Sequence, residues 1–141
     1  MAATEPRRVL LIQGHPDPSP HLCHLLADAY AEGAAGAGHA VRRLDIAALD
    51  FPLLRVPHDW EHGTVPEGLR AAQADIAWAQ HIVLLFPLWL GDMPALVKGF
   101  LEQVLRPGFA FERATGELIG HKLLKGRTAR LVVTMGMPPL V

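Results

Sequence analysis

The sequence has 141 residues, enough for one domain with a hydrophobic core and too few for two, so we expect a single domain over residues 1–141. Thirteen Lys and Arg side chains nearly balance fourteen Asp and Glu side chains, which argues against the basic surface that attracts nucleic acids or anionic membranes. The single cysteine, Cys23, excludes an internal disulfide and a thiolate metal cage, and it favours a reducing, cytoplasmic setting.

The first predicted strand is the apolar run of residues 9–12, which is far too short for a signal-peptide core or a membrane span. We therefore expect no targeting segment and no membrane insertion. A continuous apolar run that ends at a glycine, here Gly14, is typical of a strand buried on both faces of a parallel sheet. Ser19-Pro20, a capping residue followed by a proline, predicts the start of a helix. The apolar positions of that helix recur at helical spacing at Leu22, Leu25, Leu26 and Ala29.

The middle of the chain begins with residues 40–46, a weakly alternating stretch that predicts a strand with one wetter face. Residues 47–66 contain four prolines or glycines, two histidines and Trp60 without a sustained period. We expect a long loop there, because no regular element explains such a composition. A helix over residues 67–80 follows, and then a buried strand over residues 81–86.

The last predicted elements are a proline-started amphipathic helix over residues 94–105 and a strand over residues 128–134. The alternation of strands and helices predicts an α/β fold with a doubly wound parallel sheet, because parallel strands need crossover helices that pack on both faces. Ligands of such sheets bind beyond the carboxyl ends of the strands. The loops after the first, third and fourth predicted strands are therefore the candidate functional segments.

The first of these loops covers residues 13–20. It has neither a Gly-x-Gly-x-x-Gly turn nor a Gly-Lys-Ser/Thr motif, which argues against a dinucleotide-binding turn and a P-loop. A strand that leads into a capped helix N-terminus favours an anion such as a phosphate. Since no Lys or Arg occurs between Arg8 and Arg42, backbone amides, His15 and Ser19 would hold that anion. Alternatively, Ser19 only caps its own helix and His15 is an ordinary loop residue.

The second loop, residues 86–94, carries large apolar side chains just beyond a buried strand. Such side chains suit a flat aromatic ligand such as an isoalloxazine ring. Alternatively, Leu88 and Trp89 cover the core or fill a subunit interface. In the third loop, Thr134-Met135-Gly136-Met137-Pro138, a hydroxyl and a glycine could expose amides to ligand oxygens or ring nitrogens.

These loops together resemble the NAD(P)H dehydrogenase (quinone) family, which includes quinone reductases and the flavoprotein partners of glutathione-gated potassium efflux systems. The resemblance covers essentially the whole chain and implies a flavodoxin-like fold that binds FMN or FAD as a homodimer. Its motifs are a His at the end of the first strand with a Ser four residues later, Phe-Pro-Leu-Trp (86–89), Met-Pro-Ala-Leu-x-Lys-Gly (93–99), Pro-Gly-Phe-Ala-Phe (107–111) and Thr-x-Gly (134–136).

The resemblance assigns roles by position. His15 and Ser19 would lie at the flavin phosphate or diphosphate, and Thr134 and Gly136 at the polar edge of the ring. The ring itself would be lined by Pro87, Leu88, Trp89 and Leu90. Two departures from the family concern Leu90, where members commonly have a second aromatic residue, and Met135-Gly136-Met137, where they have a Thr-Gly-Gly run.

The substrate of the family stacks over the ring, partly beneath the neighbouring subunit, so Trp60 and His58 are candidates for the pocket wall. Alternatively, the histidines of this loop are ordinary surface residues. The implied reaction is hydride transfer from NAD(P)H to the flavin and on to a quinone, without a protein nucleophile. We can assign no catalytic acid from the sequence.

A flavodoxin-like sheet has five parallel strands in the order 2-1-3-4-5, of which the sequence predicts four. We therefore expect the order 2-1-3-4, with the fifth strand missing. Two other functions remain open, a flavin-binding ancillary subunit of a membrane transporter and a truncated chain without activity. A phosphorelay receiver is excluded, because Gln13-Gly14 and Phe86-Pro87 occupy the positions of its carboxylates. We expect no metal site, since only His21 and His24 share a helical face, and the eight histidines are expected to be solvated.

Overall fold

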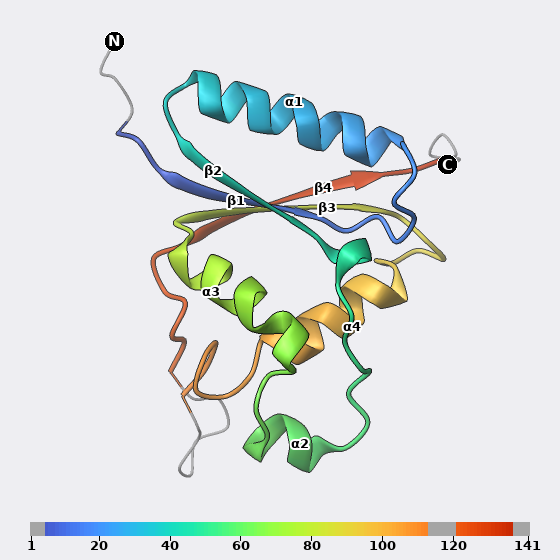
Figure 1. Cartoon of the computed structure of the whole chain (residues 1–141), viewed down its shortest axis with the longest axis vertical. Coiled ribbons are helices and arrows are strands. Elements are labelled where there is room, and N and C mark those ends of the chain that lie inside the picture. Colours follow the sequence, from blue (N-terminus) through green and yellow to red (C-terminus); the bar gives the residue numbers. More distant parts are fainter. Residues whose placement is uncertain (1–4, 113–120, 137–141) are drawn as a thin grey trace.

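The computed structural model describes residues 5–112 and 121–136, which form a four-stranded sheet with helices on both faces (Figure 1). All three strand pairings are parallel, and the spatial order is β2-β1-β3-β4, so the predicted fold class and the predicted order 2-1-3-4 are confirmed. The strands are β1 (Arg8–Gln13), β2 (Ala40–Asp45), β3 (His81–Pro87) and β4 (Thr128–Thr134).

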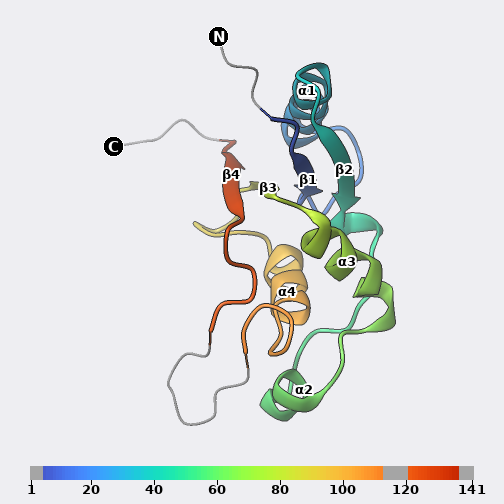
Figure 2. The same cartoon turned by 90° about the vertical axis from the view of Figure 1, so that its left-hand side faces the viewer.

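The helices divide between the two faces of the sheet, with α1 on one face and α3 and α4 on the other (Figure 2). None of the helices in the described part of the chain is long and apolar enough to cross a membrane. Their bounds are α1 (Leu22–Gly36), α2 (Pro57–His62), α3 (Arg70–Trp78) and α4 (Ala95–Val104), with two 3₁₀ turns, η1 (Ile46–Ala48) and η2 (Glu67–Leu69).

The core lies on both faces of β1 and β3, as their continuous apolar sequences predict. Because successive strand residues point to opposite faces, each strand contributes to two clusters. Leu10 and Leu84 belong to the cluster that contains residues of α3 and α4. Leu11 and Val83 belong to the smaller cluster beneath α1. The sheet is thus fixed from both sides, and its carboxyl ends are held in place.

The start of α1 differs from the prediction that Ser19-Pro20 begins the helix. The backbone amide of Ser19 donates to Oδ1 of Asp17 at 2.9 Å, and its hydroxyl donates to Oδ2 at 2.7 Å. This local turn occupies the hydroxyl that was expected to cap the helix. The helix instead begins at Leu22, with His21 in the N-cap position. Ser19 is therefore not the cap.

The side of α1 that faces the sheet carries small residues. Cys23 and Ala27 are buried, whereas the predicted apolar positions Leu22 and Leu25 are 57% and 64% exposed. Cys23 and Ala27 therefore pack towards the sheet, and Leu22 and Leu25 point away from it. The apolar spacing correctly predicts the helix, but it does not identify the buried face.

The expectation of a long loop over residues 47–66 is wrong in part, because η1 extends to Ala48 and α2 lies within this segment. None of the residues of α2 is buried, so its sequence lacks the apolar period that reveals a helix. Polar contacts hold it instead. Nε1 of Trp60 donates to the backbone oxygen of Leu105 at 3.2 Å, and Nη1 of Arg106 donates to that of Asp59 at 2.5 Å.

Candidate functional site

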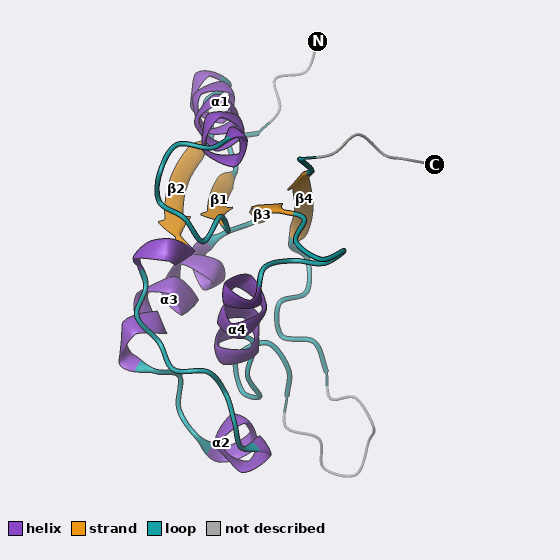
Figure 3. Ribbon diagram, turned by 90° about the vertical axis from the view of Figure 1, so that its right-hand side faces the viewer, coloured by secondary structure: helices purple, strands orange, loops and turns teal. Residues whose placement is uncertain are grey.

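A cleft of about 750 Å³ opens beyond the carboxyl ends of β1, β3 and β4. The loops that follow these strands lie at one end of the sheet, which faces the viewer in Figure 3. Seven of the eight residues that the sequence predicts for cofactor binding line this cleft, namely His15, Pro87, Leu88, Trp89, Leu90, Thr134 and Gly136. The segments that supply them are far apart in the chain, so the parallel sheet brings them together.

Close contact between β1 and β3 sets the path of the first loop. The amide of Gly14 donates to the backbone oxygen of Leu85 at 2.7 Å. A Cβ atom on Gly14 would lie 2.6 Å from that oxygen and 2.9 Å from Cγ2 of Val97. Glycine is therefore the residue that lets the chain leave β1 so close to β3. This path places His15 against the loop that follows β3.

His15 is the centre of a group of aromatic rings at the mouth of the cleft. Its ring stacks on that of His21 at 3.9 Å between centroids, and it meets the edge of Trp89 at 5.8 Å. The ring of His24 lies 5.6 Å away. Burial lowers the pKa of His15, and repulsion by His21 and His24 lowers it further. The expectation that the histidines are solvated is therefore wrong for His15, which is buried.

Asp17 adds a fixed negative charge to this loop. The backbone amide of Ser19, followed by the His21 ring and the Ser19 hydroxyl, holds the pKa of the Asp17 carboxyl well below its usual range. Nε2 of His21 lies 2.8 Å from Oδ2 of Asp17. Ser19 itself does not line the cleft. The hydroxyl of Ser19 donates to Asp17 in this arrangement. The predicted role of Ser19 at a phosphate stays a prediction.

The loop after β3 ends in a tight turn that holds apolar side chains in solvent. The backbones of Trp89 and Asp92 exchange two hydrogen bonds, of 2.9 and 3.1 Å, and the two residues between them have positive φ angles, 50° for Leu90 and 80° for Gly91. A left-handed conformation costs a leucine about 1 kcal/mol. Leu90 is nonetheless fully exposed, and Trp89 is 48% exposed. A strained, apolar tip of this kind is typical of a ligand-binding loop.

The end of β4 forms a further wall of the cleft and is hydrogen-bonded to α1 and to the loop after β3. Sγ of Cys23 lies 3.0 Å from Oγ1 of Thr134, and the backbone oxygen of Thr134 accepts from the amide of Leu88 at 2.8 Å. The end of β4 is thereby fixed against α1 and against the loop after β3. Met137 and Pro138 of the predicted third loop lie outside the described residues.

The structure also adds residues that the sequence did not assign to the site. His21, Leu22 and Cys23, at the head of α1, and Met135 line the cleft beside the predicted residues. Their role depends on the start of α1 at Leu22 rather than at Ser19. A correct reading of Asp17 as the turn-forming residue would have indicated them, since Asp commonly binds the backbone two residues further on.

Trp60 and His58 do not line this cleft. Trp60 belongs to a separate groove of about 580 Å³ between α2 and α4. The ring of His58 lies 4.8 Å from that of His62, and both histidines are exposed. The two residues therefore form no wall of the cleft within their own chain. Their predicted contribution across a subunit boundary stays a prediction.

Comparison with known proteins gives consistent similarities. Residues 7–140 match the family described as "Flavodoxin-like fold". The chain is 28% identical over 156 residues to a ribosyldihydronicotinamide dehydrogenase-like protein, traD, of Penicillium crustosum, with 92% of this chain and 57% of that protein covered. It is 37% identical over 75 residues to an uncharacterized NAD(P)H oxidoreductase of Haemophilus influenzae, with 53% of this chain and 36% of that protein covered.

Among solved structures, the chain is similar to a putative quinone reductase from Klebsiella pneumoniae, with a TM-score of 0.73 and 27% identity. This alignment covers 92% of this chain and 60% of the Klebsiella chain. The chain therefore spans about a third to three fifths of the length of these relatives.

Proposed function

The chain belongs to the flavodoxin-like fold family, and from this premise we propose that it is a flavin-dependent NAD(P)H:quinone oxidoreductase that holds FMN or FAD in the cleft beyond β1, β3 and β4. The observation that carries the proposal is the convergence of seven predicted cofactor residues, from three distant loops, on one cleft. The names of the relatives support the same activity, since they include NAD(P)H oxidoreductases and a putative quinone reductase.

The cleft fits a flavin in size and in chemistry. Its volume of about 750 Å³ lies within the range usual for ligand and cofactor sites. Trp89 and Leu90 offer exposed apolar surface for a flat ring. When bound, the flavin would supply two-electron hydride transfer.

The residues of the chain would bind and orient the cofactor. In the proposal, Trp89 and Leu90 lie against the ring, and Thr134 and Gly136 approach its polar edge. Nδ1 of His15 accepts from the amide of Asp17 at 3.1 Å, so the neutral ring carries its proton on Nε2. That proton is available to a phosphate oxygen without a salt bridge from Lys or Arg.

The proposal extends to a homodimer in a cytoplasmic setting. A neighbouring subunit that covers the cleft would exclude water from it and would give Trp60 and His58 their predicted place. Light scattering of the flavin-loaded protein measures the mass. A monomer with full quinone reductase activity would contradict the shared pocket.

The test of the proposal is the visible absorbance spectrum of the purified protein, after addition of FMN or FAD and removal of the excess. A retained flavin, released by heat and identified, supports the cofactor site. Oxidation of NADH or NADPH that depends on an added soluble benzoquinone supports the activity. Retention without turnover would favour an ancillary flavoprotein, whereas no retention of either flavin would overturn the proposal.

Replacement of Trp89 by alanine is expected to weaken FMN binding about fivefold, the worth of one aromatic stacking contact of about 1 kcal/mol. Quenching of flavin fluorescence measures the dissociation constant. Leu53→Ala is the matched control, because Leu53 is also an exposed apolar residue and lies outside the cleft. Equal dissociation constants for the Trp89→Ala and parent proteins would remove Trp89 from the site.

FMN affinity is expected to rise as the pH falls from about 8 towards 6, because binding of the phosphate favours the protonated form of His15. Burial lowers the pKa of His15 below 6.5 in the free protein, so the ring is neutral at the start of this range. The anion raises that pKa, and affinity increases between the bound and free pKa values by up to about tenfold per pH unit for one proton taken up.

Two controls isolate this effect. Riboflavin, which has the same ring without the phosphate, is expected to bind with little change over the same pH range. His15→Asn is expected to flatten the slope for FMN. An equal slope for both ligands would show that the titrating group does not face the phosphate.

A further inference from the structure

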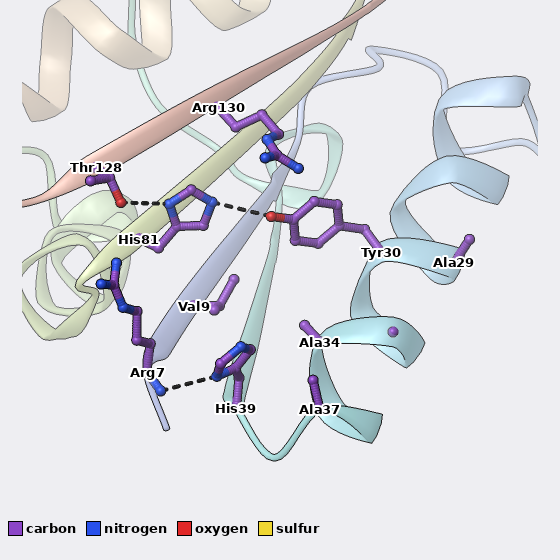
Figure 4. Close-up of a pocket in the computed structure, with 11 residues that line it drawn as sticks. Arg7, Val9, Ala29, Tyr30, Ala34, Ala37, His39, His81, Thr128 and Arg130 are labelled. Carbon is purple, nitrogen blue, oxygen red and sulfur yellow. Dashed lines mark hydrogen bonds between the residues drawn. The ribbon is translucent and has the colours of Figure 1, made fainter. Parts of the chain in front are cut away.

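A second pocket, of about 490 Å³, lies under α1 at the amino ends of the strands and takes no part in the proposed flavin site (Figure 4). His81 and Thr128 begin β3 and β4, and Arg7 precedes β1, so this pocket is at the opposite end of the sheet from the cleft. Its wall on the α1 side is apolar, made of Tyr30 and small residues. The facing wall is polar and cationic.

The cationic wall is formed by Arg7, His39, His81 and Arg130, and none of the described residues that line the pocket is a carboxylate. Within residues 5–112 and 121–136, neither Arg7 nor Arg130 forms an ion pair. Burial lowers the pKa of His81, and repulsion by the nearby Arg130 and Arg7 lowers it further. Mutual repulsion of this kind is relieved when an anion binds.

The polar groups are also arranged to donate hydrogen bonds. Nδ1 of His81 lies 2.7 Å from Oγ1 of Thr128, and its Nε2 lies 3.1 Å from the hydroxyl of Tyr30 (Figure 4). The hydroxyl that accepts from this ring keeps its own hydrogen for a ligand. Nδ1 of His39 accepts from the amide of Arg7 at 3.1 Å, so its neutral ring carries its proton on Nε2. Guanidinium, imidazole and hydroxyl donors therefore share one pocket.

We propose that this pocket binds a small organic anion, whose carboxylate or phosphate is held by the guanidinium groups of Arg7 and Arg130 and whose apolar part rests on Tyr30. Guanidinium groups match both oxyanions because their donors form a planar fork. The volume suits a small molecule. The site is independent of the flavin proposal, since it shares no residue with the cleft.

The experiment uses Tyr30, which is the single tyrosine of the chain. Protein labelled with 3-fluorotyrosine gives one ¹⁹F resonance, and that resonance reports on this pocket. Benzoate and inorganic phosphate are titrated separately at constant ionic strength set with chloride. A saturable shift is expected, and the probe that binds at the lower concentration identifies the preferred oxyanion.

Variants of Arg7 and Arg130 test whether the shift of the ¹⁹F resonance depends on the two guanidinium groups. Arg7→Gln and Arg130→Gln are each expected to raise the dissociation constant at least fivefold, and both side chains are exposed, so the fold should tolerate the changes. Arg70→Gln removes the same charge from α3, outside the pocket, and should leave binding unchanged. The proposal is overturned if neither anion gives a saturable shift, or if the pocket variants bind like the parent. It is equally overturned if the resonance follows protein concentration instead of anion concentration, because a second copy then covers the pocket.

Discussion

Replacement of Gly14 by alanine is expected to lower the free energy of unfolding by about 2 to 3 kcal/mol, as overpacking at a rigid site does. The new methyl group would lie 2.6 Å from the backbone oxygen of Leu85 and 2.9 Å from Cγ2 of Val97. The oxygen belongs to β3, which is bonded on both sides and cannot move away without breaking its pairing with β1 or β4. The loop that carries His15 must therefore shift.

Two measurements test this effect. Urea denaturation followed by circular dichroism gives the loss of stability, and FMN titration of the folded variant gives the loss of affinity. Gly33→Ala is the matched control, because Gly33 lies inside α1 with no atom within 4 Å of the added carbon. That change should stabilise the protein by about 0.5 to 1 kcal/mol. If Gly14→Ala is as stable as the parent, the close approach of the strands does not constrain this loop.

Replacement of Arg106 by methionine is expected to cost about 3 kcal/mol of stability, because it removes three hydrogen bonds and takes the donor away from the backbone and side-chain oxygens of Gln103. Nε of Arg106 donates to the backbone oxygen of Gln103 at 2.8 Å, Nη1 to that of Asp59 at 2.5 Å, and Nη2 to the side-chain oxygen of Gln103. Arg106 is buried and forms no ion pair in the described part of the chain. Arg106 stabilises the fold by connecting α2, through Asp59, to the end of α4, through Gln103.

The control for Arg106 is Arg70→Met, which removes an exposed guanidinium and should change stability by less than about 0.5 kcal/mol. Arg106→Lys keeps the positive charge but lacks the planar guanidinium with its several donors. We therefore expect its loss of stability to lie between those of Arg106→Met and Arg70→Met. Hydrogen exchange at the Gly63 amide, which donates to the backbone oxygen of Asp59 at 3.0 Å, should be fastest in Arg106→Met. Unchanged exchange there would mean that α2 is held by other contacts.

The strands and the main crossover helices could be predicted from the sequence because burial dictates their composition. Residues 9–12 and 81–86 are continuous apolar runs, and both faces of these strands are indeed covered. By contrast, α2 could not be predicted, since it buries none of its residues. The packed face of α1 was also hidden, because Cys23 and Ala27 carry a weaker apolar signal than the exposed leucines around them.

The site could be predicted where position along the chain determines position in space. Loops after parallel strands must meet at the carboxyl ends, which is why Trp89 and Thr134 line the same cleft. The predicted cap at Ser19 was wrong because Asp17 binds the amide and the hydroxyl of Ser19, a competition that residue types alone do not decide. The pocket at the amino ends of the strands could not be predicted from the sequence, because Arg7 and Arg130 lie in segments without a recognisable motif.

The wholly parallel sheet also governs how the chain can fold. Val9 pairs with Val41, 32 residues further on, but it pairs with His81 at a separation of 72 residues. Closure of the longer loop costs about 0.7 kcal/mol more chain entropy. We therefore expect β1, α1 and β2 to associate first and β3 to join β1 later, without the fast hairpin steps of antiparallel sheets. Pulsed hydrogen exchange during refolding should protect the amides between β1 and β2 before those between β1 and β3, and simultaneous protection would contradict this order.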